Sequence, residues 1–338
     1  MKTKRVGKQS AVLPSKPVIL AGGSVAGLDE AKGPLGKYFD YLLEEDLFGE
    51  DSWEKCERKM FAEAVEIAIN KAGKTKQDID VLMGGDLLNQ IISASFAARA
   101  LGIPFLGQYG ACSTMSQSMV VAAMLIDGGF SKYAACAASS HFATAERQYR
   151  LPVEMGTQKP VQAQHTVTGA GCAIMAAEGA GPKVTAITIG KVEDWGITDS
   201  NNMGAAMAPA AAETIRAHLT DLQLQPDHYD LIVTGDLGKL GRKLCLELLD
   251  EMNINVQGRF YDCGCEVLDS ESDKHSGASG CGCSAIVFNG YLLPKLQRGE
   301  IKRMLFLATG ALLSQTSVMQ QDSVPSIAHA VAIEGQVN

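Results

Sequence analysis

The sequence lacks any concentration of positive charge, and this absence excludes one large class of functions. Its 338 residues include 30 Lys and Arg against 38 Asp and Glu, which gives a formal net charge of −8. Proteins that bind nucleic acid neutralise phosphates with clustered basic side chains. The one short basic segment is 1–5, and terminal segments of this kind are usually disordered tails. We therefore expect no nucleic-acid partner.

Long apolar runs and a disulfide framework are also missing. No stretch approaches the ~20 apolar residues of a transmembrane helix. Pro14 interrupts the apolar start at 11–13, so we expect no signal peptide. The nine cysteines are too few and too irregularly spaced for a secreted disulfide scaffold in so long a chain. These absences predict synthesis in a reducing cytoplasm, free thiols, and at most a peripheral role at a membrane.

What the sequence does contain is an internal repeat. Residues 80–87 match residues 230–237, and each segment is a short apolar strand that ends in Gly-Asp-Leu. The segments that precede them, 61–71 and 211–222, have the apolar spacing of amphipathic helices. A weaker match, between strands expected at 132–139 and 302–309, supports a duplicated unit.

Helices alternate with strands in both halves, a pattern that predicts parallel strands buried between helices. A Gly/Pro break at 179–182 precedes a strand expected at 184–189. We therefore expect an α/β fold of two halves, residues 1–182 and 183–338, that pack together.

The sharpest local feature is the turn around Cys112, between a strand expected at 103–106 and an apolar helix at 119–126. This places Cys112 at the N-terminus of a buried helix, where the helix dipole and free N–H groups lower the pKa of a thiol. An ordinary buried cysteine in a tight turn is the alternative, and the segment alone favours neither.

An Ala-Cys-Ser turn before a buried helix, in a duplicated α/β chain, resembles the thiolase and β-ketoacyl synthase superfamily. The Gly-rich loop 275–280 is similar to a thiolase active-site loop, although one residue shorter. The resemblance implies a five-layer α-β-α-β-α sandwich of two duplicated halves, usually found as a homodimer.

The enzymes of this superfamily need a base and oxyanion donors beside the cysteine. At the position of the catalytic His of the synthases, this chain has Thr-Gly-Asp at 234–236, and at the position of their Asn it has Ala278 or a neighbour. At the position of the second Cys of thiolases, it has Leu-Ala-Thr-Gly at 307–310. We therefore expect no Claisen condensation and no catalytic residue. The alternative is an active acyltransferase that uses Cys112 with His275 or His141.

Short motifs between Pro17 and Ile333 carry a resemblance over nearly the whole chain. They are 33–36, 85–90, 105–106, 110–114, 139–141, 143–148, 166–169, 196–200, 203–212 and 309–314. Together they resemble the stage V sporulation protein AD family of endospore-forming bacteria. The resemblance implies binding of dipicolinic acid, free or as its calcium complex, and peripheral attachment at the spore inner membrane. It implies other subunits of the same spore-membrane channel as partners.

Dipicolinate is a planar pyridine with two carboxylates, so its site needs cationic and hydroxyl donors and a flat apolar slot. Arg147 and His141 are candidate cations, and the helix start at Cys112 offers N–H groups to an anion. Asp86 and Asp236 end equivalent strands and are hard oxygen ligands if calcium enters with the ligand. The candidate ligand-binding residues are therefore Asp86, Cys112, Ser140, His141, Arg147, Asp236 and Ser279.

Each candidate also has a structural interpretation. Arg147 beside Glu146 is equally consistent with a structural ion pair, and His141 with a hydrogen-bonded turn histidine. For Asp86 and Asp236, helix capping ranks ahead of metal ligation. Lys159 and His165, in a long connection, are further polar candidates. A structural subunit with a vestigial pocket remains a third interpretation of the whole chain.

Two Cys-Gly-Cys pairs, at 263–265 and 281–283, offer four thiols that could close a zinc site. Structural zinc sites favour wider spacing within each pair, and the second pair stands before an expected strand at 285–288. We therefore expect buried thiols, no metal site, and no cofactor other than calcium that arrives as part of the ligand.

Overall fold

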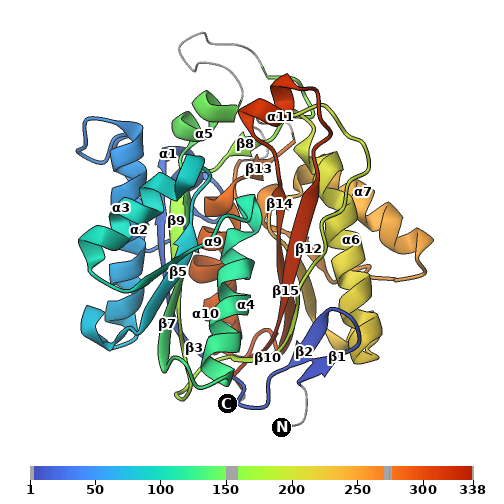
Figure 1. Ribbon diagram of the computed structural model, residues 1–338, viewed down its shortest axis with the longest axis horizontal. Helices are drawn as coiled ribbons and strands as arrows, with labels where there is room; N and C mark the ends of the chain where they lie inside the picture. The colour runs from blue at the N-terminus through green and yellow to red at the C-terminus, as the bar shows by residue number, and fades with distance from the viewer. Residues whose placement is uncertain (1–3, 150–158, 270–273, 275, 337–338) are drawn as a thin grey trace.

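The computed structural model describes residues 4–149, 159–269, 274 and 276–336, and Figure 1 shows their arrangement. Residues 1–3 of the basic start, and His275, lie outside this part. Ten of the described strands form one path, in the order β12-β11-β14-β15-β10-β3-β9-β7-β5-β6. The path joins two five-stranded sheets at a single pair, Lys183 with Val18.

Each half of the chain builds one of these sheets with the same topology. The first sheet contains β3 (Val18–Ala26), β9 (Gly169–Ala176), β7 (Tyr133–Ser140), β5 (Val81–Gly85) and β6 (Phe105–Gly107). The second contains β10 (Lys183–Thr188), β15 (Ser326–Glu334), β14 (Arg303–Ala311), β11 (Leu231–Thr234) and β12 (Phe260–Asp262). The matched segments of the sequence occupy equivalent places, β5 with β11 and β7 with β14. The duplication predicted from the sequence is therefore visible in the strand order.

The prediction of parallel strands holds for most of each sheet and is wrong for one strand in each half. β9 runs antiparallel to both β7 and β3, and β15 runs antiparallel to both β14 and β10. Ser140 at the end of β7 pairs with Gly169 at the start of β9. The connection between them therefore returns to the same end of the sheet, and no crossover to the opposite end is present to make the strand parallel.

Helices lie on both outer faces and between the sheets. The outer layers are α2 (Trp53–Lys71) with α3 (Ile92–Leu101), and α6 (Met203–Leu222) with α7 (Gly238–Glu251). The middle layer contains α4 (Thr114–Asp127), α9 (Cys281–Val287), a π-helical turn at Phe288–Leu292, and α10 (Leu293–Gln297). Figure 1 shows α4 and α10 between the two sheets, with α2 and α3 on one side and α6 and α7 on the other. This is the predicted five-layer sandwich.

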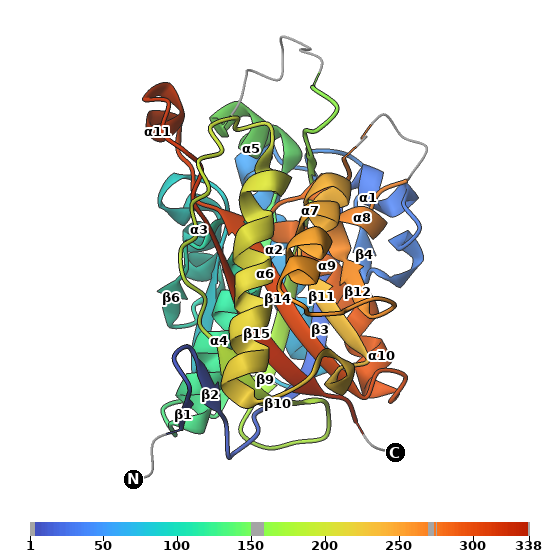
Figure 2. The ribbon, with the colours of Figure 1, turned by 90° about the vertical axis from the view of Figure 1, so that its right-hand side faces the viewer.

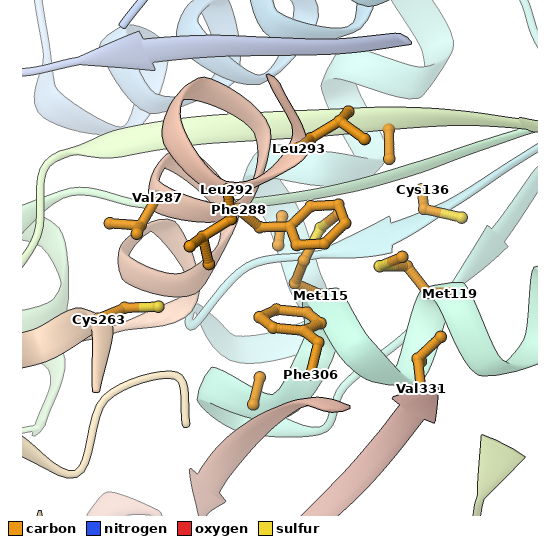
Figure 3. Packing of buried hydrophobic residues seen from close by; sticks show 14 of the residues in the cluster. Met115, Met119, Cys136, Cys263, Val287, Phe288, Leu292, Leu293, Phe306 and Val331 are labelled. Atoms are coloured by element: carbon orange, nitrogen blue, oxygen red, sulfur yellow. The ribbon is translucent and has the colours of Figure 1, made fainter. Parts of the chain in front are cut away.

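The apolar faces of these helices explain the layers. On α2, Phe61, Ala64, Val65 and Ile69 are buried against the first sheet, at the spacing read from the sequence. α4 is buried along most of its length, as a central helix must be. Met115 and Met119 of α4 pack with Phe288 and Phe306 between the sheets, as Figure 3 shows. The rings of Phe288 and Phe306 lie 4.7 Å apart.

The prediction of a strand at 285–288 is wrong. This segment lies at the end of α9 and the start of the π-helical turn. Four apolar residues fit a buried helix as well as a buried strand, so length could not separate the two. Among the described residues, no helix combines the length and apolarity that crossing a bilayer requires.

The shorter elements gather at the two ends of the sandwich. At one end lie α1 (Leu28–Lys32), α5 (Phe142–Tyr149), α8 (Cys263–Glu266), α11 (Gln315–Met319) and the parallel pair β8 (His165–Thr166) with β13 (Ala278–Ser279). At the other end, the hairpin of β1 (Arg5–Val6) and β2 (Ser10–Val12) lies beside α6, as Figure 2 shows. Asp221 of α6 accepts the N–H groups of Gln9 and Ser10.

Candidate ligand-binding site

Cys112 stands on a sharp turn between edge strand β6 and central helix α4. The turn is a single 3₁₀ turn, Ala111–Ser113, and Ala111 has a φ of 49°, which is uncommon for a residue with a side chain. The Ser113 hydroxyl donates to Gly110 O at 2.6 Å and thereby holds the turn. The second half supports it from β14, where Gly310 packs on the backbone of Gly110 too closely for a Cβ. A strained turn with this support presents the thiol in a fixed position.

Three groups from the second half surround the thiol and its neighbour Asp236. The Sγ atom of Cys112 lies 3.8 Å from the Ser279 hydroxyl oxygen. That hydroxyl donates to Asp236 Oδ2 at 2.8 Å, and the Thr309 hydroxyl donates to Asp236 Oδ1 at 2.7 Å. The N–H of Gly280 also donates to Oδ2, at 3.1 Å. Asp236 is fully buried, and these donors satisfy its carboxylate.

These surroundings make the Cys112 thiol less acidic than an ordinary cysteine. Burial raises the pKa of Cys112 well above its usual range, and the charge of Asp236 raises the pKa further. Of the two interpretations that the sequence left open, the structure favours the ordinary buried cysteine, because desolvation and a nearby carboxylate oppose the helix dipole. Near neutral pH the group is a thiol, which is a poor nucleophile.

A cavity of about 350 Å³ lies in front of Cys112, at the end of the molecule that carries α5 and α11. Cys112, Ser279 and Thr166 lie at its wall. Most of the remaining lining is apolar and comes from both halves, including Leu87, Ala145, Met203, Ala311 and Leu313. A largely apolar cavity with a few convergent polar groups is typical of a small-molecule site.

Two tyrosines form one side of the cavity. The hydroxyl oxygens of Tyr109 and Tyr149 lie 3.0 Å apart, and the Tyr149 hydroxyl donates to Leu87 O. Because Tyr149 uses its proton on Leu87, the Tyr109 hydroxyl donates to the Tyr149 oxygen. Tyr109 is half exposed, so its ring borders the cavity and the surface together.

The acidic side chain in the described lining is the carboxyl group of Glu146 on α5, which is 5% exposed. The ammonium of Lys159 lies 2.8 Å from Glu146 Oε1, and the Thr166 hydroxyl donates to the same oxygen at 3.2 Å. Neither Lys nor Arg appears in the described lining itself. Anion recognition at this wall therefore depends on what stands behind Glu146.

Of the seven residues predicted to bind ligand, the structure brings three together. Cys112 and Ser279 line the cavity, and Asp236 lies directly behind them. Asp86, Ser140, His141 and Arg147 are not part of the described lining. Their contacts, described next, show what each one does in the fold.

Asp86 caps a helix, as its structural interpretation predicted, whereas Asp236 does not. Asp86 accepts the N–H of Ala94, in the first turn of α3, and the N–H of Leu88, each at 2.7 Å. The corresponding start of α7 is capped from elsewhere, because Asp262 accepts the N–H groups of Leu237 and Gly238. The side chain of Asp236 therefore turns towards the cavity.

Ser140 and His141 are fully engaged in the fold. The Ser140 hydroxyl donates to Val167 O at 2.6 Å and accepts the N–H of Gly282 at 3.0 Å. The Nδ1 atom of His141 accepts the N–H of Ala143, so Nε2 carries the proton and donates to Asp46 O at 3.1 Å. Burial lowers the pKa of His141. A neutral histidine with both ring nitrogens bonded matches the interpretation of a turn histidine.

Arg147 forms an ion pair, but with Glu54 of α2 and not with Glu146. Its guanidinium also lies 5.4 Å from the ring centre of Trp53. It borders a separate polar groove of about 280 Å³ on the other side of α5, together with Thr144 and Gln148. The ligand-binding role of Arg147 stays a prediction, and this placement does not favour it.

The paired cysteines make contacts of ordinary thiols. Cys281 donates to Ala111 O at 2.9 Å, and Cys283 donates to Gly235 O at 3.3 Å. In the part of the chain that the structure describes, no three His, Cys, Asp or Glu side chains are grouped as a metal would require. None of the described histidines lines the cavity, and His275 lies outside the described residues.

Sequence reasoning missed Glu146 and the two tyrosines as parts of the cavity wall. Tyr109 directly precedes the motif 110–114, and Glu146 stands next to Arg147 in the motif 143–148. A helical wheel for 142–149 puts Ala145, Glu146 and Tyr149 on one side. That grouping was the available signal, but only the packing of α5 shows which side faces the cavity.

Comparisons with known proteins agree with this architecture. The profile of the stage V sporulation protein AD (SpoVAD) family matches residues 7–334. Stage V sporulation protein AD of Bacillus subtilis (strain 168) is 45% identical over 331 residues, which cover 98% of each chain. The chain belongs to the SpoVAD family. It is thus a member of a family of sporulation proteins.

Solved structures extend the likeness to the fold. The 3-oxoacyl-[acyl-carrier-protein] synthase III of Aquifex aeolicus superposes with a TM-score of 0.58 at 13% identity, over 94% of this chain and 99% of that one. The Acat5 thiolase of Ascaris suum, solved with coenzyme A, gives 0.56 at 10% identity, over 95% and 100%. At these identities the likeness shows a thiolase-like fold and nothing about activity.

Proposed function

We propose that this SpoVAD-family protein binds dipicolinic acid in the Cys112 cavity without transforming it, and so supports uptake of this compound into the forespore. The observation that carries the proposal is a largely apolar cavity at whose wall the Cys112 thiol is buried and has a raised pKa. An aromatic dicarboxylate fits a largely apolar wall with hydroxyl groups at one end. Family membership supplies the connection to sporulation.

The chemistry around the thiol supports a binding role over an enzymatic one. A cysteine nucleophile needs a base or a depressed pKa, and Cys112 has a carboxylate beside it and a raised pKa. Burial raises the pKa of Asp236, and its carboxylate accepts hydrogen bonds from Ser279 and Thr309, which hold it as part of the wall behind the thiol. We propose no resident cofactor, with calcium present only where it accompanies the ligand.

The partners and location follow from the same proposal. The protein acts at the spore inner membrane as a peripheral subunit and contacts other subunits of the dipicolinate channel. Two copies associate through β6, which in the described chain pairs with β5 on one side only. Leu106 on this strand is 46% exposed in the single chain, so the edge strand of a second copy would cover an apolar side chain there.

Calorimetric titration of dipicolinate into the purified protein tests the proposal. We expect saturable binding, and a loss of affinity of about tenfold in Cys112→Ala, because the ligand loses a contact at the polar end. Cys245→Ala is the matched control, since Cys245 is also buried but lies on α7, outside the described lining of the cavity, and this variant should bind normally. A parallel incubation with an acyl-CoA should leave Cys112 unmodified by mass spectrometry. Stoichiometric acylation without dipicolinate binding would establish the acyltransferase alternative instead.

A further inference from the structure

The charge around the cavity poses a problem for an anionic ligand. Two acidic side chains lie at or behind the described wall: Glu146, which lines it, and the buried Asp236. Both are carboxyl groups, and a ligand with two carboxylates would be repelled by them in a low-dielectric cavity. A cation within reach of the wall is therefore required.

In the described part of the chain, Lys159 supplies a cation directly beside the lining residue Glu146. Its Nζ lies 2.8 Å from Oε1 of Glu146, the oxygen that also accepts the Thr166 hydroxyl. The Lys159 side chain is 29% exposed, so its charge is only partly screened by solvent. Its ammonium also lies 4.5 Å from the ring centre of Phe142, which fixes the direction from which it approaches the wall.

Arg147 does not supply this cation, although it directly follows Glu146 on the same helix. It is held by Glu54 and Trp53 at the groove on the opposite side of α5. Glu146 and Arg147 are adjacent in the sequence and therefore point about 100° apart around the helix, which separates their surroundings.

Resting on the proposed function, we propose that Lys159, held by Glu146 at the cavity wall, is the cationic group that selects a carboxylate ligand. A lysine ammonium has three donors on a flexible stem, so it can contact a ligand carboxylate beside Glu146 without leaving the wall. Glu146 positions the ammonium and at the same time sets a cost for every added negative charge. Lys159 thereby raises the affinity for a ligand carboxylate, and Glu146 lowers it.

Binding of three ligands to the full-length protein tests this assignment. They are dipicolinate, pyridine-2-carboxylate with one carboxylate, and the uncharged pyridine-2,6-dicarboxamide. We expect Lys159→Met to weaken dipicolinate by about tenfold or more, as loss of a charge-assisted contact does. The loss should be smaller for pyridine-2-carboxylate and below about twofold for the diamide. Lys159→Arg should restore most of the affinity.

Two further variants separate charge selection from a structural role. Glu146→Gln removes a like charge and should strengthen dipicolinate binding a few-fold, whereas Arg147→Met should change it by less than about twofold. The assignment fails if Lys159→Met binds dipicolinate like the wild type. It also fails if the Lys159 and Glu146 variants lose affinity together for all three ligands, because that indicates a disturbed wall. A wild-type protein that binds no dipicolinate would overturn the proposed function itself.

Discussion

At the scale of single residues, buried carboxyl groups determine the chemistry of this protein. Asp236 lies behind Cys112 and raises the pKa of the thiol, although burial contributes more. The resemblance to enzymes of this fold implies that their histidine corresponds to the segment 234–236, and that correspondence stays a prediction. The hydrogen bonds that Asp236 accepts from Ser279, Gly280 and Thr309 fix these groups around the thiol.

Removing the charge of Asp236 should therefore make Cys112 more reactive. In Asp236→Asn we expect alkylation of Cys112 by iodoacetamide at pH 8 to be several-fold faster, because the pKa of the thiol falls. Peptide mass spectrometry of timed samples measures the rate. Asp230→Asn, at the other end of β11, removes a distant charge and should leave the rate unchanged. Equal rates in both variants would show that burial alone suppresses the thiolate.

Glu30 provides a second residue-scale prediction, on pH. Its side chain is buried, and burial raises its pKa from 4.5 to about 7. The folded state then holds the proton more tightly than the unfolded chain, so stability is complete below pH 4.5 and falls as the pH rises through about 7. Glu30→Gln should remove about 3 kcal/mol of this dependence between pH 5 and pH 8.

Urea unfolding at the two pH values measures the effect. The free energy of unfolding of Glu30→Gln should equal that of the wild type near pH 5 and exceed it at pH 8. Glu44→Gln, at an exposed position, serves as the control and should follow the wild type. Parallel pH profiles for Glu30→Gln and the wild type would mean that Glu30 stays ionised in the fold.

At the scale of elements, the start of α3 depends on one buried side chain. Between the two N–H groups that Asp86 accepts, Gln90 and Ile91 have φ values of 59° and 46°. Residues with side chains resist this region, so the segment needs external support. Leu87, which lines the cavity, begins the same segment. The cap of α3 thus connects to the shape of the site.

Asp86→Ala should lower the free energy of unfolding by about 2 kcal/mol, since two buried N–H groups lose their acceptor. The exposed Asp78, which accepts the Thr75 N–H in a 3₁₀ turn, is the matched control, and Asp78→Ala should cost clearly less. Urea unfolding at pH 7.5 measures both. Equal losses would contradict the importance given to the buried cap.

At the scale of the whole molecule, the two halves share a topology but divide the work. Asp86 and Asp236 follow equivalent strands, yet one caps a helix and the other turns to Ser279 and Thr309. The site therefore combines a turn from the first half with side chains from the second. A division into domains at 182/183 stays a prediction, because both halves contribute to one cavity.

The edge strand β6 carries the whole-molecule prediction. If two copies pair through β6, Leu106→Arg should convert the dimer to a monomer, because a charge on the edge opposes strand pairing. Size-exclusion chromatography with light scattering gives the mass directly. Val192→Arg, at a half-exposed position in the second half, should leave the dimer intact. A wild-type monomer would contradict the proposed association.

The sequence by itself determined the fold class, the duplication, the turn at Cys112 and the family. These features depend on local periodicity and on motifs of adjacent residues, which a linear reading preserves. It also identified Cys112, Asp236 and Ser279, because each stands in such a motif. The directions of the antiparallel strands β9 and β15 depend on the end of the sheet to which the preceding connection leads, which local patterns do not show. The helix at 285–288 could not be distinguished from a strand, because four apolar residues fit either.

Only the tertiary structure decided which side chains meet. Cys112 and Ser279 come from different halves of the chain, and so do Glu146 of α5 and the β14 residue Ala311 at the same cavity. The ion-pair partner of Arg147 is Glu54 on α2, and the ion-pair partner of Glu146 is Lys159. A pKa depends on burial and on neighbouring charges in space. The raised pKa of the Cys112 thiol therefore followed from packing, whereas its helix-start position alone predicted the opposite.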